Sequence, residues 1–174
     1  SRILVHSNHI RRSARAFGDS PAAEHVPMDA IPFSGSRALA RGAVTRNQLR
    51  TRYRAVFRDV YVDRDVELTA AAKARAAWLS TGAILAGRSA AAVLGTKWLD
   101  AAAPAEIVRS DRHGQPGIVV HSYRLADDEV RTVRGMRVTT PARTAFDIGC
   151  GLPVVWALPI LDALFNATRI EPTQ

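Results

Sequence analysis

The first well-patterned stretch of the chain alternates short polar and apolar runs in the way that predicts two short helices. Ser36 is placed to cap a helix over 37–41, and Gly42 can end it with a positive φ. Thr45 is placed to cap a second helix over 46–52, since its hydroxyl can accept a backbone N–H of the first turn. The apolar positions expected to pack between these helices are Leu39, Val44 and Leu49.

A β-hairpin is predicted directly after the helix pair. The runs 53–57 and 60–62 are rich in β-branched and aromatic residues, and the polar pair Arg58-Asp59 separates them. This pair lacks the glycine of the most favoured two-residue turns, so the turn type stays open. A helix pair followed by such a hairpin is the order of a winged helix-turn-helix, with the hairpin as the wing.

The rest of the chain mixes helical and strand patterns. It is expected to form helices over 68–79, 90–94, 141–148 and 154–168, and strands over 105–108, 117–123, 130–133 and 136–138. Thr69 and Ser89 are the expected caps of the first two helices, and Arg134-Gly135 is the expected turn of a second hairpin. Pro159 is expected to kink or break the last helix.

These patterns predict an α+β fold of three parts. Residues 1–30 read as a poorly ordered extension rich in Pro, Gly and Ser, although Ile10, Ala14 and Phe17 are spaced for one face of a short helix. Residues 31–66 would be the winged helix-turn-helix-like unit. Residues 67–174 would be a small α/β domain with short hairpins and C-terminal helices.

Positive charge is concentrated on the predicted helix pair and hairpin. Eight arginines and two aspartates lie between Arg37 and Arg64, a local excess of +6 (8 minus 2) in a chain of net charge +8. A basic patch on a compact helix pair is typical of a protein that binds duplex DNA. The alternative is a solvated basic face in a protein from a GC-rich genome, because nearly all the basic residues are Arg.

The sequence contains none of the common motifs of catalysis or cofactor binding. The chain has no phosphate-binding glycine loop, no dinucleotide-type glycine pattern, no Gly-x-Ser-x-Gly elbow and no Glu-x-Lys pair of a metal-dependent nuclease. Asp111, His113 and His121 could converge, but the set lacks a further strong metal ligand. The acidic run Asp127-Asp128-Glu129 reads as a solvated turn. We therefore expect a protein that is not an enzyme and holds no cofactor or metal.

The sequence also predicts a cytoplasmic protein without membrane contact. The longest uncharged run near the end, 148–161, has 14 residues and two prolines, whereas a membrane span needs about 20 apolar residues. No secretory signal is visible. The single cysteine, Cys150, excludes an internal disulfide framework and reads as structural.

The segments Thr139–Asp147 (TTPARTAFD) and Leu49–Val62 (LRTRYRAVFRDVYV) resemble a group of actinobacterial, especially mycobacterial, proteins. The N-terminal part of those proteins is similar to AbiEi-type antitoxins of type IV toxin–antitoxin systems, and many continue into a Vsr-like endonuclease domain that is absent from this chain. The resemblance covers about residues 30–170. It implies a winged-helix DNA-binding unit, an α/β domain, and a promoter-binding regulator that counters a cognate toxin protein.

The resemblance assigns DNA contacts residue by residue. Thr45, Arg46, Asn47 and Arg50 would lie on the recognition helix, where Arg suits guanine and Asn suits adenine. Arg54 and Arg58 would lie on the wing. The side chains expected to meet phosphates are Arg37, Arg41, Arg52 and Arg54.

Two alternative functions stay open. The chain could be the non-catalytic targeting portion of a Vsr-like endonuclease family protein. It could also be a protein-interaction module anchored by Trp98 and Trp156, although such residues more often belong to a core. Arg143 and Asp147 are four positions apart on one predicted helix and are expected to pair, either to support the fold or to serve a direct function.

Overall fold

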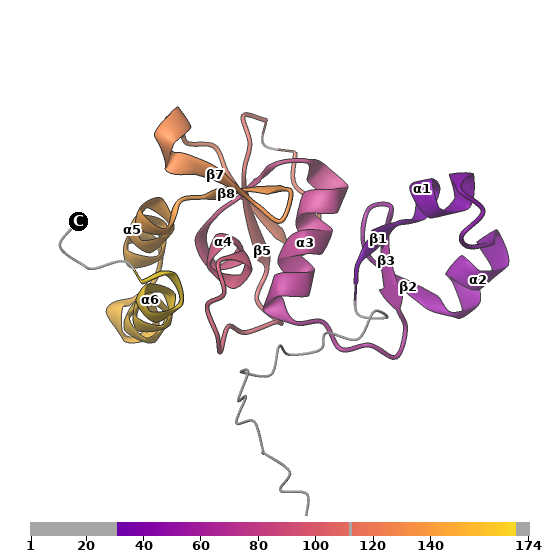
Figure 1. The fold of residues 1–174 in the computed structure, drawn as a ribbon, viewed down its shortest axis with the longest axis horizontal. Helices are drawn as coiled ribbons and strands as arrows, with labels where there is room; N and C mark the ends of the chain where they lie inside the picture. The colour runs from indigo at the N-terminus through magenta and orange to yellow at the C-terminus, as the bar shows by residue number, and fades with distance from the viewer. Residues whose placement is uncertain (1–30, 112, 170–174) are drawn as a thin grey trace, which may run out of the picture.

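The computed structural model describes residues 31–111 and 113–169 (Figure 1). Within them, six α-helices and two β-sheets succeed one another along the chain. The fold is therefore mixed α+β, as the sequence predicted. The expectations for residues 1–30 lie outside the described residues, and the division at residue 66 stays a prediction.

The small sheet combines the hairpin with one earlier strand. It is antiparallel and has the order β1-β3-β2, and the two short helices lie between its first and second strands along the chain. The bounds of these elements are β1 Phe33–Ser34, α1 Gly35–Ala40, α2 Arg46–Thr51, β2 Tyr53–Phe57 and β3 Val60–Asp63.

The ends of the two short helices are set by local hydrogen bonds. Thr45 caps α2 as predicted, and Gln48 returns a side-chain hydrogen bond to the backbone of Thr45, which completes a capping box. The predicted cap Ser36 is wrong: Ser34 caps α1, and Ser36 instead donates from its backbone N and its hydroxyl to Asp59. The helix therefore begins two residues earlier than its pattern indicated, because a distant carboxylate holds Ser36.

The tip of the β2–β3 hairpin is packed against the rest of the molecule. Asp59 takes a positive φ of 57°, which replaces the missing glycine of the turn. The backbone N–H of Arg58 donates to Gln115 at 3.0 Å, and the Ser80 hydroxyl donates to the Arg58 carbonyl at 2.8 Å. Phe57, at the end of β2, is buried in the main core. The hairpin tip is thus fixed between α1 and the second sheet.

The large sheet has the order β6-β5-β4-β8-β7. Its central pair β4–β8 and its edge pair β5–β6 are parallel, whereas β4–β5 and β7–β8 are antiparallel. The strands are β4 Ile84–Leu85, β5 Ala105–Val108, β6 Ile118–His121, β7 Val130–Val133 and β8 Met136–Thr139. The predicted turn Arg134-Gly135 joins β7 to β8, and both residues have a positive φ.

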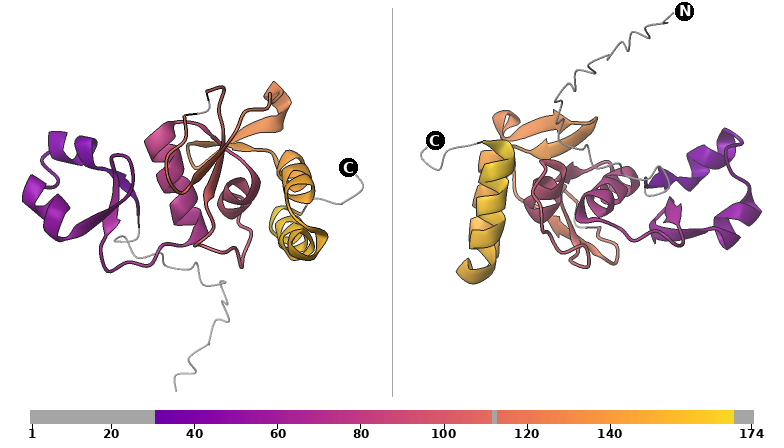
Figure 2. Two further views of the ribbon diagram at one scale, coloured as in Figure 1. Left: turned by 180° about the vertical axis from the view of Figure 1, so that it is seen from behind. Right: turned by 60° about the horizontal axis from the view of Figure 1, so that its bottom comes forward.

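Four further helices accompany this sheet: α3 Ala70–Thr81, α4 Gly87–Val93, α5 Pro141–Gly151 and α6 Val154–Thr168. In Figures 1 and 2, α3 stands between the small sheet and the large one, and α5 and α6 lie at the opposite end of the molecule. Thr69 caps α3, as predicted, and Gly82 ends the helix in the left-handed conformation. The short 3₁₀ turn η2 (Asp127–Glu129) precedes β7.

The expected cap Ser89 is wrong, and of the two outcomes expected at Pro159, a kink or a break, the break does not occur. The residue before α4 is Ala86, not Ser89, because the Ser89 hydroxyl is buried and accepts the backbone N–H of Glu106 on β5. Pro159 does not break α6, which continues to Thr168. The carbonyl that loses its partner belongs to Val155, which is 69% exposed, so water can satisfy it.

Small side chains build the main core. Ala74, Ala76 and Ala77 of α3 are fully buried against Leu85 and Ile107 of the large sheet. Alanine lets the helix approach the sheet closely, which fits a chain with few aromatic residues. Phe57 and Val60 of the small sheet belong to the same core, so α3 joins the two sheets. A second cluster, around Ile148, lies under α6.

Candidate functional site

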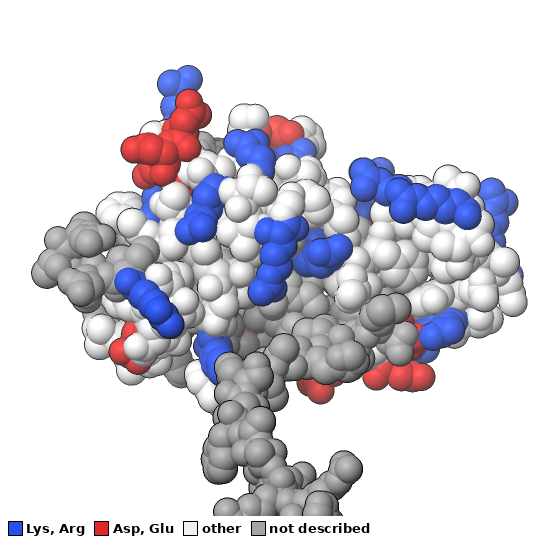
Figure 3. All heavy atoms as spheres, viewed as in Figure 1, with Lys and Arg blue, Asp and Glu red and all other residues white. Residues whose placement is uncertain are grey.

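The two short helices carry four exposed arginines. Arg37 and Arg41 are four positions apart at α1, and Arg46 and Arg50 are four positions apart at α2, so each pair shares one side of its helix. Among the described residues, no carboxylate forms an ion pair with any of the four. Figure 3 shows positive side chains gathered along the edge formed by α1, with acidic ones at the opposite edge of the same lobe.

The second helix presents its polar side to solvent. Arg46, Asn47 and Arg50 are exposed, only Leu49 is partly covered, and α2 has no buried residue. The helix therefore does not lie beneath the second sheet and is accessible to a large partner. Thr45 lies at its start, and its hydroxyl accepts the backbone N–H of Gln48 at 3.2 Å, so the structure gives this residue a capping role.

Arg52 and Arg54 form internal contacts. The Nε of Arg52 lies 3.0 Å from a carboxylate oxygen of Asp63, and this hydrogen bond lowers the pKa of Asp63 below its usual value. Arg54 is partly buried and donates to the carbonyl of Val66 at 3.0 Å. Arg64 similarly donates to the carbonyl of Arg50 at 2.9 Å. Arg52 and Arg64 link α2 to the end of the hairpin, and Arg54 links β2 to the segment after β3, so all three side chains make contacts within this lobe.

The predicted wing residue Arg58 lies at the hairpin tip, and its side chain is exposed. Its backbone is bound to Gln115 and Ser80, so the tip faces the end of α3 and the connection between β5 and β6. The neighbouring Asp59 accepts hydrogen bonds from Ser36 and Ser34, which lower the pKa of its carboxyl, and the charge of Arg37 adds to this effect. The hairpin thus supports α1 as well as flanking it.

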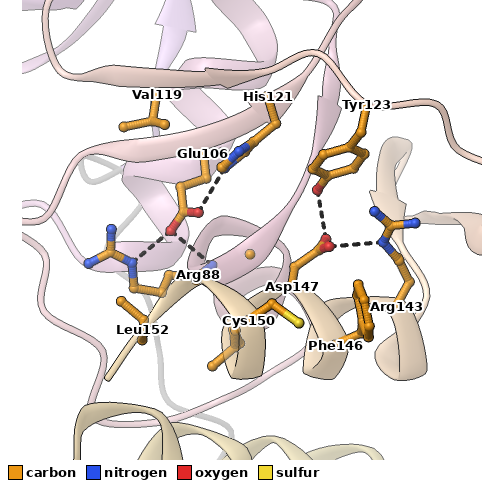
Figure 4. Close-up of a pocket in the computed structure, with 13 residues that line it drawn as sticks. Arg88, Glu106, Val119, His121, Tyr123, Arg143, Phe146, Asp147, Cys150 and Leu152 are labelled. Atoms are coloured by element: carbon orange, nitrogen blue, oxygen red, sulfur yellow. Dashed lines mark hydrogen bonds and ion pairs between the residues drawn. The ribbon is translucent and has the colours of Figure 1, made fainter. Parts of the chain in front are cut away.

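The structure also forms a pocket that the sequence patterns did not predict. It has a volume of about 400 Å³ and lies between β5, β6 and α5 (Figure 4). Its apolar wall includes Val119, Phe146 and Leu152, and two polar groups of side chains face it from either side. This size and this mixture of surfaces are typical of small-molecule sites.

Glu106 is the centre of the first polar group. One of its carboxylate oxygens accepts from the Nε of Arg88 at 2.7 Å, and the other lies 3.1 Å from the Nε2 of His121. Gly87 has a φ of +49° and leaves no space for a Cβ beside the Glu106 carboxylate. A close approach of this backbone to the carboxylate therefore requires glycine at this position.

Arg143 is the centre of the second group. Its Nε lies 2.9 Å from Asp147, which confirms the predicted pair, and its Nη1 lies 2.9 Å from Glu129. Its guanidinium also covers the ring of Tyr123, whose hydroxyl donates to Asp147 at 2.8 Å. Burial raises the pKa of Tyr123, and the hydrogen bond to Asp147 raises it further. The hydrogen bond from Arg143 lowers the pKa of Glu129.

These two groups hold the pocket walls in place. Both oxygens of Glu106 and both oxygens of Asp147 already have protein partners. The spacing of Arg143 and Asp147 is a local signal and was predictable. Nothing in the sequence joined Glu106 to His121, because they meet only through the parallel pairing of β5 with β6.

The histidines and acids weighed as metal ligands do not form a cluster. Asp111 pairs with Arg109 at 2.7 Å and accepts the backbone N–H of His113 at 3.3 Å, and the ring Nδ1 of His113 lies 3.9 Å from a carboxylate oxygen of Asp111. His121 instead faces Glu106. Within 31–111 and 113–169, no group of three or more His, Cys, Asp or Glu side chains has the geometry to hold a metal ion.

Neither protein-family models nor curated proteins give a match to this chain. The resemblance to AbiEi-type antitoxins therefore depends on the motifs quoted above. In the part of the chain that the structure describes, no helix combines the length and apolar character that a membrane span requires.

Proposed function

We propose that this chain binds duplex DNA through α1 and α2 and acts as a regulator of the AbiEi antitoxin type. The observation that carries the proposal is the set of four exposed arginines, Arg37, Arg41, Arg46 and Arg50, none of which forms an ion pair with a carboxylate among the described residues. Unpaired guanidinium groups on one lobe attract phosphates, and the release of counterions drives such binding.

The order of elements supports the same proposal. Two short helices precede an antiparallel hairpin, and the second helix exposes Arg46, Asn47 and Arg50 together. Those residue types suit the base edges of the major groove, whereas Arg37 and Arg41 suit phosphates. Arg52 and Arg54 hold the lobe together in this scheme, and a cognate toxin protein would be a second partner.

The test is a fluorescence-anisotropy titration of the full chain with labelled genomic duplex at several salt concentrations. Binding should weaken steeply as salt rises. Arg46→Ala and Arg50→Ala should each weaken binding by about 1–3 kcal/mol, the range for a base-contacting arginine.

Arg131→Ala is the matched control, because Arg131 is an exposed arginine on β7 and its loss changes the net charge equally. Its effect should be small. No salt-dependent binding in low salt at micromolar protein, or equal losses for the three variants, would contradict the proposal.

A further inference from the structure

The first two turns of α6 expose an apolar surface. Val154, Val155 and Leu158 are 60–70% exposed, and Trp156 is 68% exposed. The buried side of the helix, at Ala157 and further along at Leu164, is apolar as well. A helix that is apolar all round is normally covered on all sides. In the described structure, one side of α6 lacks such a cover.

Trp98 stands beside this helix and points into solvent. It is 94% exposed and has a φ of +64°, a left-handed conformation that side chains such as Trp rarely adopt. It borders a groove of about 390 Å³ that is also lined by Pro159, Ala163 and Ala167 of α6. An exposed tryptophan held beside a groove of small residues is the arrangement of an interface anchor and its receiving site.

The charge distribution indicates which partner can bind this surface. The whole chain carries +8, so two copies repel each other across most of their surfaces. The helix α6 contains only one charged residue, Asp162, and the groove adds only Lys97. The two charges cancel within one copy, and across a two-fold axis each can face its opposite. The face is therefore one where a second copy of this chain can approach without net repulsion.

The exposed area is also close to what a dimer needs. Trp98, Trp156 and the three aliphatic side chains of α6 present an area on the order of 700 Å², given that one large aromatic side chain covers about 150–250 Å². A standard interface takes about 800 Å² from each partner. The same patch on both copies would form an isologous contact, which closes at two subunits.

We propose that Trp98 and the exposed apolar face of α6 form a self-association surface, on which Trp98 of one copy enters the α6 groove of a second copy. The pairing is two-fold, with Lys97 of each copy facing Asp162 of the other. It does not depend on DNA binding.

The test is sedimentation velocity of the full chain without DNA, from micromolar to submillimolar concentration. The wild type should show a reversible equilibrium between monomer and dimer. The double variant Val155→Glu/Leu158→Glu should be monomeric throughout, because it places like charges on the apolar face. Trp98→Ala should weaken dimerisation about tenfold or more, as expected for an interface anchor.

The double variant Ala55→Glu/Thr132→Glu is the matched control, since both residues are exposed and uncharged on strands away from α6 and the charge change is equal. It should dimerise like the wild type. Far-UV circular dichroism verifies the fold of each variant. The concentration series of the wild type tests self-association without any substitution. A wild type that stays monomeric, an open-ended series of larger species, or equal dimerisation of the two double variants would overturn the proposal.

Discussion

At the scale of single residues, positive backbone φ angles occur at positions with a clear structural task. Asp59, Trp98 and Arg134 all take them, and each lies where the chain must turn sharply or present a side chain. Asp59 is the best supported, because its carboxylate accepts hydrogen bonds from Ser34 and from two groups of Ser36. Asp tolerates this conformation better than most residues. The residue therefore serves both the hairpin turn and the start of α1.

The substitution Asp59→Asn should make the free energy of unfolding less dependent on pH in the acidic range. Asn also tolerates the turn, but it cannot carry the negative charge. The Ser36 and Ser34 hydrogen bonds lower the folded-state pKa of Asp59, so its carboxylate stabilises the fold above an unfolded value of about 3.9 and loses this effect as pH falls through the folded pKa. Urea unfolding should show the wild type more stable at pH 7 by about 0.5–1 kcal/mol, the range for an exposed site.

That difference between wild type and variant should shrink as the pH approaches 3. Asp65→Asn is the control, because Asp65 is also exposed and none of the described groups donates a hydrogen bond to its side chain. Asp65→Asn should leave the stability at pH 7 nearly unchanged. A gap between Asp59→Asn and wild type that stays constant from pH 7 to pH 3 would contradict a role for the charge.

At the scale of elements, α6 departs furthest from the rules that its sequence suggests. It tolerates an interior proline, and its exposed first turns are apolar. The apolar first turns suit the self-association surface proposed above, because a helix side that a second copy covers is expected to be apolar. By contrast α2 and α3 follow local rules closely, with a capping box on α2 and a Thr cap and left-handed Gly end on α3.

Pro159→Ala should stabilise the protein. The substitution restores one backbone hydrogen bond and removes the ring clash in a continuous helix, and the expected gain is about 1–3 kcal/mol. Urea unfolding at low micromolar protein concentration measures it with little contribution from association.

Pro153→Ala is the matched control. Pro153 directly precedes the first turn of α6, where no helical hydrogen bond is lost, so the change in stability should be small. Equal effects of the two substitutions would show that the interior position of Pro159 is not what costs stability.

At the scale of the whole molecule, the two proposed surfaces lie at opposite ends. Figures 1 and 2 show α1 and α2 at one end of the long axis and α6 at the other, with the large sheet between them. A dimer formed through α6 would carry its two basic helix pairs at its outer ends. Such a dimer could hold two DNA segments at once, while each helix pair binds as it does in the monomer.

The variant Val155→Glu/Leu158→Glu should therefore bind one short duplex within about twofold of the wild-type affinity, since mutations at distant sites act independently. It should lose the ability to bring two duplexes together. Energy transfer between donor-labelled and acceptor-labelled duplexes measures the bridging, and anisotropy measures the single-site affinity. A parallel loss of both would show that the two surfaces are coupled.

Local chemistry in the sequence determined most secondary-structure elements of this protein and part of its candidate site. The caps of α2 and α3, the two hairpins and the Arg143–Asp147 pair all depend on residues within a few positions of one another. The basic character of α1 and α2 was likewise visible from the order of the residues. Such features are predictable because nearby backbone and side-chain groups satisfy one another without help from the rest of the fold.

Only the tertiary structure decided which side chains are bound within the protein and which are exposed to solvent. It bound Arg52 and Arg54 internally, placed Ser36 on Asp59, joined Glu106 to His121 across paired strands, and left Trp98 and Trp156 in solvent although such residues more often lie in a core. These outcomes depend on contacts between segments far apart in the chain. The spacing of residues along a helix or strand carries no information about which distant surface will cover it.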